Sequence, residues 1–256
     1  VVFLCLTSSA FAQTVLLVDG SINAPSGTNV YSTLQGAIDA AADGDIIHVA
    51  PAPGGYDAIT IEGKSVKIYG PGYFVGNVGW NHIKVGDNGN DDPDVSLVGS
   101  AVSGTEIYGL DLGKVVPENA DASALENVVI ARCVVNVFRR DDIGSGQVQN
   151  FVLRNNIINL LSTRERNSSG LPVSNTIIAH NIFRNQATVY SGGQVYNNIF
   201  RGGSSYEFTD SQVNNNIFYD ISLVNCLTNG VCENSDYQNN IFHETGADDH
   251  DFGADP

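Results

Sequence analysis

One position of a repeated unit in the second half of the chain carries polar, basic and aromatic residues. Arg184 and Arg201 occupy it in two successive units. If the apolar residue beside it points inward, alternation along a strand directs this position outward. Guanidinium, amide and aromatic groups in one line are suited to contacting sugars and their carboxylates. The residues in this line are Asn136, Asn159, Arg184, Arg201, Tyr219 and His243.

This line of residues has two interpretations. In the first it is a sugar-binding surface, with substrate-binding candidates Asn159, Arg184, Arg201 and Tyr219. The candidates for catalysis are then Arg184, Arg201 and His243. The alternative is a solvated face whose long side chains spread over the surface and form no site.

A second candidate site is an acidic segment, Gly86 to Asp94. Its four carboxylates and two Asn amides supply the oxygen ligands that Ca²⁺ prefers, although it lacks the pattern of an EF-hand loop. The candidate ligands are Asp87, Asp91, Asp92 and Asp94. A solvated acidic loop is the alternative. Ca²⁺ is the one cofactor that the sequence suggests.

Composition excludes several other functions. The chain has 28 Asp and Glu against 12 Lys and Arg, a net charge of −16, and such a protein repels nucleic acid. The five His residues lack metal-ligand spacing. On the repeats, Asp141 and Asp142 are the only acidic pair, so hydrolysis by two carboxylates is disfavoured. No apolar run approaches the roughly 20 residues of a membrane span.

These candidates must be positioned by a repeat of about twenty residues. The unit is an apolar residue, two spacers, Asn, Ile, and then Phe or Ile. A period of this length with short apolar segments predicts a β-solenoid, in which stacked coils align like residues into columns. Asn tolerates the left-handed backbone of a sharp turn, and its amide can bond to the coils above and below. The predicted structural ladder is Asn156, Asn181, Asn198, Asn216 and Asn240.

Two apolar columns follow this Asn, one of Ile and one of Ile or Phe. Strict alternation would bury only one of them. We expect the turn geometry to bury both, because an exposed apolar ribbon would require a loop or a partner to cover it.

The ends of the chain have their own signals. Residues 1–12 have the pattern of a residual signal peptide, an apolar run followed by Ala10-Phe11-Ala12, although an ordinary first strand is the alternative. We therefore expect export to the cell surface or the medium. Residues 13–245 form the predicted repeat domain, and residues 246–256 an acidic tail that looks truncated.

Local signals predict a helix and a disulfide. Ser32 and Gln35 suggest a capping box for a helix over residues 32–44, which would cover the first coil. Cys226 and Cys232 flank an Asn-Gly turn and are expected to form a disulfide in an oxidising compartment. Cys133 lies in an apolar run and is expected to be a buried small hydrophobic residue.

The segment from Thr33 to Pro51, followed by Gly55-Tyr56, resembles the opening of pectin-lyase-like right-handed parallel β-helix proteins. The Asn-containing units between residues 150 and 242 are similar to the repeats of that superfamily. The resemblance implies an all-β fold, a single right-handed parallel β-helix with an N-terminal capping helix. It leaves activity open, since the superfamily includes lyases, hydrolases, epimerases and surface proteins without known catalysis.

The functional prediction is a secreted monomer that binds polysaccharide or a cell-surface glycan, or that serves as a structural part of the cell surface. The alternative is a Ca²⁺-assisted lyase of uronate polysaccharides. The two differ in their products, because only a lyase releases unsaturated sugars.

Overall fold

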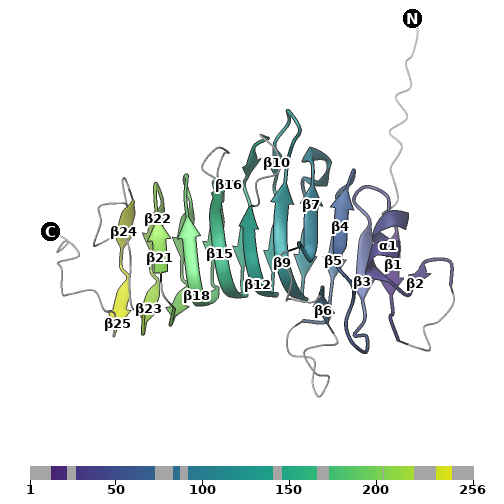
Figure 1. Cartoon of the computed structure of the whole chain (residues 1–256), viewed down its shortest axis with the longest axis horizontal. Coiled ribbons are helices and arrows are strands. Elements are labelled where there is room, and N and C mark those ends of the chain that lie inside the picture. Colours follow the sequence, from purple (N-terminus) through teal and green to yellow (C-terminus); the bar gives the residue numbers. More distant parts are fainter. Residues whose placement is uncertain are drawn as a thin grey trace, which may run out of the picture.

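The protein is built almost entirely of parallel strands. The computed structural model describes residues 13–21, 27–72, 83–86, 92–140, 146–165, 173–203, 205–221 and 235–243. In this part of the chain every paired strand is parallel to its neighbour. The strands stack along the long axis, from the region of α1 (Leu34–Ala40) to β24 (Asp236–Gln238) and β25 (Ile241–His243) (Figure 1). The arrangement is compatible with the parallel β-solenoid that the repeat predicts.

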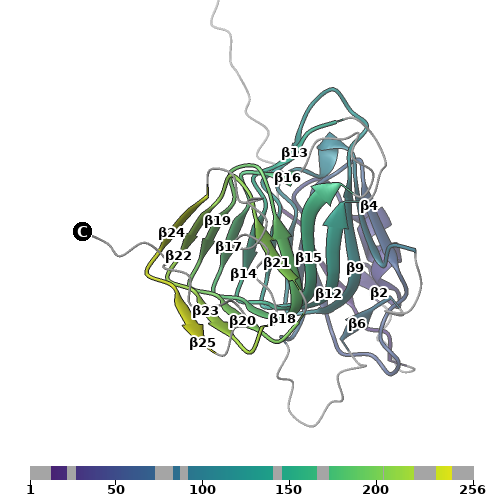
Figure 2. The same cartoon turned by 60° about the vertical axis from the view of Figure 1, so that its left-hand side comes forward.

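The strands form two long sheets and one short one. The first sheet contains β1 (Val15–Val18), β2 (Val30–Tyr31), β3 (Ile46–Val49), β5 (Lys67–Tyr69), β8 (Glu106–Tyr108), β11 (Val129–Ala131), β14 (Val152–Arg154), β17 (Ile177–Ala179), β19 (Gln194–Tyr196), β22 (Gln212–Asn214) and β24 (Asp236–Gln238). The second contains β4 (Ile59–Glu62), β6 (Lys84–Val85), β7 (Val95–Val98), β9 (Asp111–Glu118), β12 (Val134–Arg140), β15 (Ile157–Glu165), β18 (Ile182–Val189), β20 (Ile199–Arg201), β21 (Ser205–Phe208), β23 (Ile217–Tyr219) and β25 (Ile241–His243). The third contains β10 (Leu125–Glu126), β13 (Val148–Gln149) and β16 (Val173–Ser174). Figure 2 shows strands of the two long sheets on different faces of the stack.

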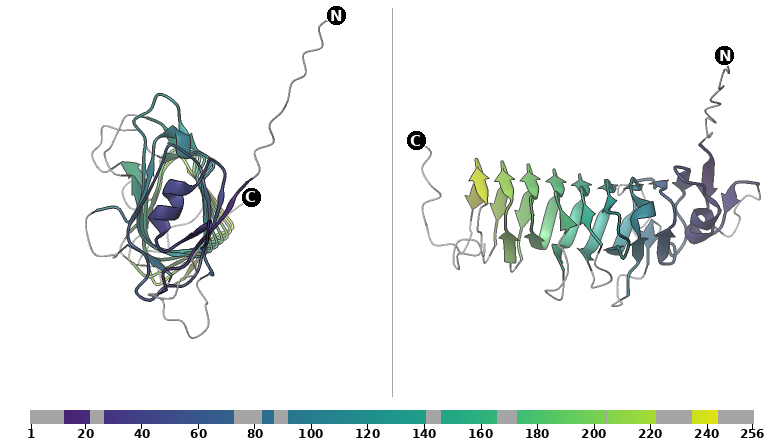
Figure 3. Two further views of the ribbon diagram at one scale, coloured as in Figure 1. Left: turned by 90° about the vertical axis from the view of Figure 1, so that its right-hand side faces the viewer. Right: turned by 90° about the horizontal axis from the view of Figure 1, so that it is seen from above.

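The α-helix lies over the N-terminal end of the stack, where the end-on view places it inside the outline of the coils (Figure 3). It buries Leu34, Ala37 and Ile38. It is shorter than the predicted 32–44. Thr33 provides the N-cap in place of Ser32, because its Oγ1 accepts a hydrogen bond of 3.2 Å from the Gly36 N–H. Among the described residues, no helix is long and apolar enough to cross a membrane.

A side chain from outside the helix satisfies carbonyl groups at its C-terminal end. The ammonium group of Lys64 donates to the backbone oxygens of Ile38, Asp39 and Ala41 at 3.0, 3.0 and 2.7 Å. A cation at this end also interacts favourably with the helix dipole.

The five ladder asparagines lie at the turns between the first and second sheets. Four of them, Asn156, Asn181, Asn198 and Asn216, are no more than 1% exposed, and Asn240 is half-buried in the last described coil. Each Oδ1 accepts from a backbone N–H one coil earlier, at 2.8–2.9 Å. Each Nδ2 donates to a backbone carbonyl of an earlier coil at 2.6–2.9 Å. The ladder therefore satisfies buried backbone groups at a turn where no sheet partner is available.

The left-handed residue of this turn is not the ladder Asn, as we had expected, but the residue before it. Its φ angles lie between 55° and 69° in the seven coils where the described residues include it. These residues are Gly109, Arg132, Asn155, His180, Asn197, Asn215 and Asn239. Gly and Asn are the residues that adopt this conformation most readily.

The prediction that both apolar columns are buried is wrong. Phe183, Phe200 and Phe218 are fully buried, and their rings stack at centroid distances of 4.7 and 4.6 Å. Most of the Ile column lies on the surface: Ile182, Ile199, Ile217 and Ile241 are 40%, 39%, 39% and 59% exposed, and Ile157 is half-buried. The later strands of the second sheet have only three residues, so the central one points inward and both neighbours point outward.

Candidate functional site

An open groove of about 410 Å³ lies on the outer face of the second sheet. It spans β9, β12, β15 and β18, and the strand register brings Asp111, Val134, Ile157 and Ile182 side by side across them. The groove is lined by Asp111, Val134, Val135, Asn136, Ile157, Asn159 and Arg184. Three residues of the predicted stripe, Asn136, Asn159 and Arg184, therefore share one groove.

The polar groups of this groove are fixed by their neighbours. The Asn159 Nδ2 donates to the Asn136 Oδ1 at 3.1 Å, which holds the two amides in one arrangement. Burial raises the pKa of Asp111, and the nearby ammonium group of Lys84 opposes this shift. Lys84 and Asp111 are direct partners in the pairing of β6 with β9.

The stripe continues beyond the groove toward the C-terminal end. Arg201, Tyr219 and His243 are paired in register on β20, β23 and β25. All three are exposed. The Tyr219 and His243 rings stack with centroids 5.3 Å apart and planes 9° apart. The predicted stripe is thus a surface line that crosses successive coils, and the exposed Ile column runs beside it.

Polar, basic and aromatic groups recur along this surface from coil to coil. Coils repeat at about 4.8 Å, so like groups recur along the axis at a short, regular interval. Guanidinium groups remain protonated and only donate hydrogen bonds, so Arg184 and Arg201 are suited to contacting carboxylates. The same property disfavours them as proton acceptors in catalysis.

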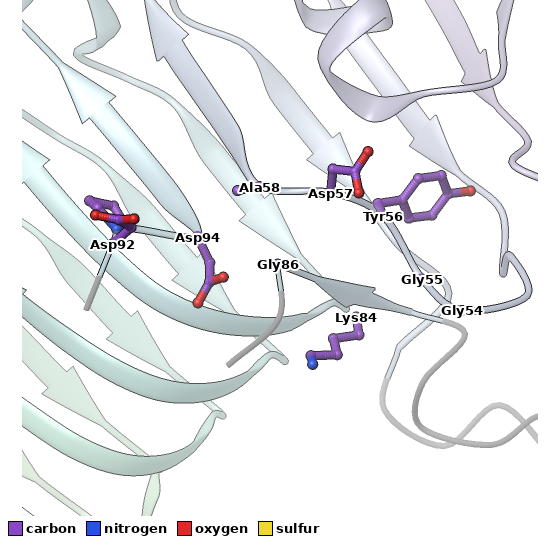
Figure 4. Close-up of a pocket in the computed structure, with 10 residues that line it drawn as sticks. Gly54, Gly55, Tyr56, Asp57, Ala58, Lys84, Gly86, Asp92 and Asp94 are labelled. Atoms are coloured by element: carbon purple, nitrogen blue, oxygen red, sulfur yellow. The ribbon is translucent and has the colours of Figure 1, made fainter. Parts of the chain in front are cut away.

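The two described residues of the predicted calcium site line a different pocket, of about 490 Å³. Tyr56, Asp57, Lys84, Asp92 and Asp94 contribute to it, and Figure 4 shows the Asp57 and Asp94 carboxylates pointing in different directions. Within the described ranges, no three His, Cys, Asp or Glu side chains form a group that could hold a metal ion. Asp87 and Asp91 lie outside these ranges, so the calcium site stays a prediction.

Asp94 has a structural contact. It is 5% exposed, and its Oδ2 accepts a hydrogen bond of 2.7 Å from the backbone N–H of Lys114. Gly86 is necessary here, because a Cβ at that position would collide with the Asp94 carboxylate. Asp92, in contrast, is exposed at the rim.

Cys133 is the one cysteine within the described ranges. Cys133 is fully buried, and burial raises the pKa of its thiol to about 12. It occupies the ladder position of its coil, where its Sγ lies 3.7 Å from the Ile107 carbonyl oxygen and 3.3 Å from that of Ala131. Cys226 and Cys232 lie outside the described residues, and their disulfide remains a prediction.

Sequence reasoning missed Lys84 and Asp111 as neighbours of the stripe. Asp111 occupies the same repeat position as the exposed Ile residues, in a unit whose motif is degenerate. Alignment of this unit with the other repeats was the sequence signal that could have placed Asp111 beside the stripe. Lys84 belongs to a two-residue strand outside the repeat, and no sequence pattern predicts its place beside Asp111.

No family model, curated protein or solved structure matches this chain.

Proposed function

We propose that this chain is a secreted right-handed parallel β-helix protein of the pectin-lyase-like class, and that it binds polysaccharide on the outer face of its second sheet. The observation that carries this proposal is the alignment of the groove with Arg201, Tyr219 and His243 in consecutive strands. A polymer lying along the axis would meet amide, guanidinium and aromatic groups in turn. The exposed Ile column would contact the apolar faces of its sugars.

Two further features support a polysaccharide partner. The chain has a net charge of −16, so a local row of Arg on its surface provides a place where an acidic polymer can approach. The described surface offers an open groove, not an enclosed pocket, which is suited to a ligand with many similar units. We propose that the protein acts as a monomer outside the cell, either free or at the cell surface.

A Ca²⁺-assisted lyase is the second candidate. It is favoured by one observation, the presence of Arg184 and of Asp111, with its raised pKa, in the same groove. A guanidinium can neutralise a uronate carboxylate, and a carboxyl group with a raised pKa can transfer protons nearer neutral pH. The acidic segment with Asp92 and Asp94 would supply the metal ligands.

An array of neutral, uronate and sulfated polysaccharides tests the first proposal. We expect binding to at least one polymer, and weaker binding by an Arg184→Ala, Arg201→Ala double variant. Incubation of the bound polymer with Ca²⁺ then tests the second, since a lyase would release products with the ultraviolet absorbance of an unsaturated sugar. Failure to bind any polymer would contradict both and favour a structural role at the cell surface.

A further inference from the structure

A third cavity, of about 380 Å³, lies on the other side of the ladder turns from the groove. It is formed where β5, β8, β11 and β14 of the first sheet end and the chain turns toward the second sheet. Tyr69, Tyr108, Arg132, Arg154 and Asn155 contribute side chains to its walls. Two guanidinium groups in one pocket are unusual in a chain with only 12 Lys and Arg.

Stacked tyrosine rings form one side of the pocket, and closely packed glycine backbones form another. The Tyr69 and Tyr108 rings stack with centroids 5.0 Å apart and planes 3° apart, and the His48 ring lies against Tyr69 at 5.7 Å with a tilt of 30°. Glycine backbones form part of the lining. A Cβ on Gly70 would collide with the Gly109 carbonyl oxygen, and one on Gly109 would lie 2.7 Å from the Gly72 nitrogen. This close backbone packing leaves the space above it free of side chains.

The charges around the pocket favour an anion. The carboxylate of Glu106 forms an ion pair of 3.1 Å with Lys67 and accepts a hydrogen bond of 2.8 Å from the Tyr108 hydroxyl. Burial acts to raise the pKa of Glu106, but the bonds from Tyr108 and Lys67 outweigh it and lower the pKa. Lys67 offsets most of the charge of Glu106, and Arg154 also acts on this carboxylate. With Arg132 included, three cations surround one carboxylate, so the pocket has a net positive charge.

Arg132 provides an independent argument. Its φ is 55°, at a turn position where four of the seven coils have Asn and one has Gly. The left-handed conformation costs Arg more free energy than it would cost Asn, so the turn alone does not explain an Arg at this position. Within the described ranges, no carboxylate forms an ion pair with Arg132, and its side chain is exposed. Arg132 thus occupies a strained turn position beside Arg154 and has no carboxylate partner in the described part of the chain. Such a cation is suited to binding an external anionic ligand.

We propose that this pocket binds the carboxylate of a uronic acid residue, with Arg132 and Arg154 as its ligands. Arg is the side chain best matched to a carboxylate, because its planar fork of donors contacts both oxygens. Arg154 also contacts the Tyr108 side chain, which positions its guanidinium group at the stacked tyrosine rings. The site is independent of the groove on the second sheet, and either could exist without the other.

Calorimetric titration with a uronate trisaccharide tests this site, with a neutral and a sulfated trisaccharide as comparisons. The variants are Arg132→Asn, which retains a residue that accepts the left-handed conformation, and Arg154→Gln. Arg139→Gln is the matched control, a partly exposed Arg on the second sheet. We expect the wild type and the control to bind the uronate trimer, and each pocket variant to bind at least about tenfold more weakly with an unreduced melting temperature.

Unchanged affinity in both pocket variants, or equal binding of the neutral trimer, would overturn the proposal. Equal binding of the sulfated trimer would overturn the assignment to carboxylates. Loss of affinity in Arg184→Ala but not in Arg132→Asn would place the ligand in the groove, so the proposed function would survive and this pocket would not. The reverse result would support the pocket and leave the groove without a role in binding this trimer.

Discussion

Replacing Asn198 by Ala should strongly destabilise the protein, because this amide serves three coils at once. Its Oδ1 accepts from the Asn181 backbone N–H at 2.8 Å and from the Asn181 Nδ2 at 3.1 Å. Its Nδ2 donates to the Ile178 carbonyl at 2.8 Å and to the Asn216 Oδ1 at 3.0 Å. Asn198 is 1% exposed, so water cannot replace these partners.

The expected loss follows from the groups left without partners. The truncation orphans the backbone N–H of Asn181 and weakens the bonding of the Ile178 carbonyl. Each such buried group costs about 1–3 kcal/mol, so the free energy of unfolding should fall by about 2–6 kcal/mol. Guanidinium unfolding followed by circular dichroism measures this change.

A neighbouring residue gives the matched control. Asn197 precedes Asn198, is exposed, and has a φ of 56°. Asn197→Gly keeps the left-handed turn and the ladder, so it should change stability by less than about 1 kcal/mol. A loss below about 1 kcal/mol for Asn198→Ala, or equal losses for the two variants, would refute the view that the ladder stabilises the stack.

Three further predictions concern the core, the thiol and the strained turn. In the same unfolding assay, Phe200→Ala should lower the free energy of unfolding by about 3–5 kcal/mol and Ile199→Ala by less than about 1 kcal/mol, because only Phe200 is buried. Similar losses for the two variants would contradict the placement of Phe200 in the core and Ile199 on the surface. Cys133 should resist a thiol reagent at neutral pH in the native state and react after unfolding, because burial raises its pKa to about 12; rapid native labelling would contradict its burial. Arg132→Asn should raise the free energy of unfolding by about 1 kcal/mol, and a decrease would show that Arg132 is itself structural.

The repeat could be predicted from the sequence because each coil has the same turn and places the same type of residue there. The turn between the two long sheets must satisfy buried backbone groups, and Asn at a fixed position does so in five coils. The strand pairings follow the same marked positions, so Ile199 pairs with Ile217 as the repeat requires. The marked positions keep this register in coils of unequal length, and the register shifts lie after them, between Arg139 and Arg140 of β12 and between Ile158 and Leu160 of β15.

The site was less predictable, because it depends on irregular parts of the chain. The outward direction of Arg184 and Arg201 followed from alternation, but Ile199 was misjudged because an apolar residue was assumed to need burial. In a strand of three residues the geometry of the turns decides the direction of each side chain. Asp111 and Lys84 could not be placed from sequence, since their proximity depends on a short strand added outside the repeat.

The most direct test of the account is the affinity of the protein for polygalacturonate, an acidic polymer, with and without the two arginines of the stripe. Calorimetry or affinity electrophoresis should compare the wild type with an Arg184→Ala, Arg201→Ala double variant at equal ionic strength, with melting temperatures as a check on folding. We expect binding by the wild type, and at least about tenfold weaker binding by the double variant without loss of stability. Equal affinity of the double variant and the wild type would contradict the claim that this face of the second sheet binds polysaccharide.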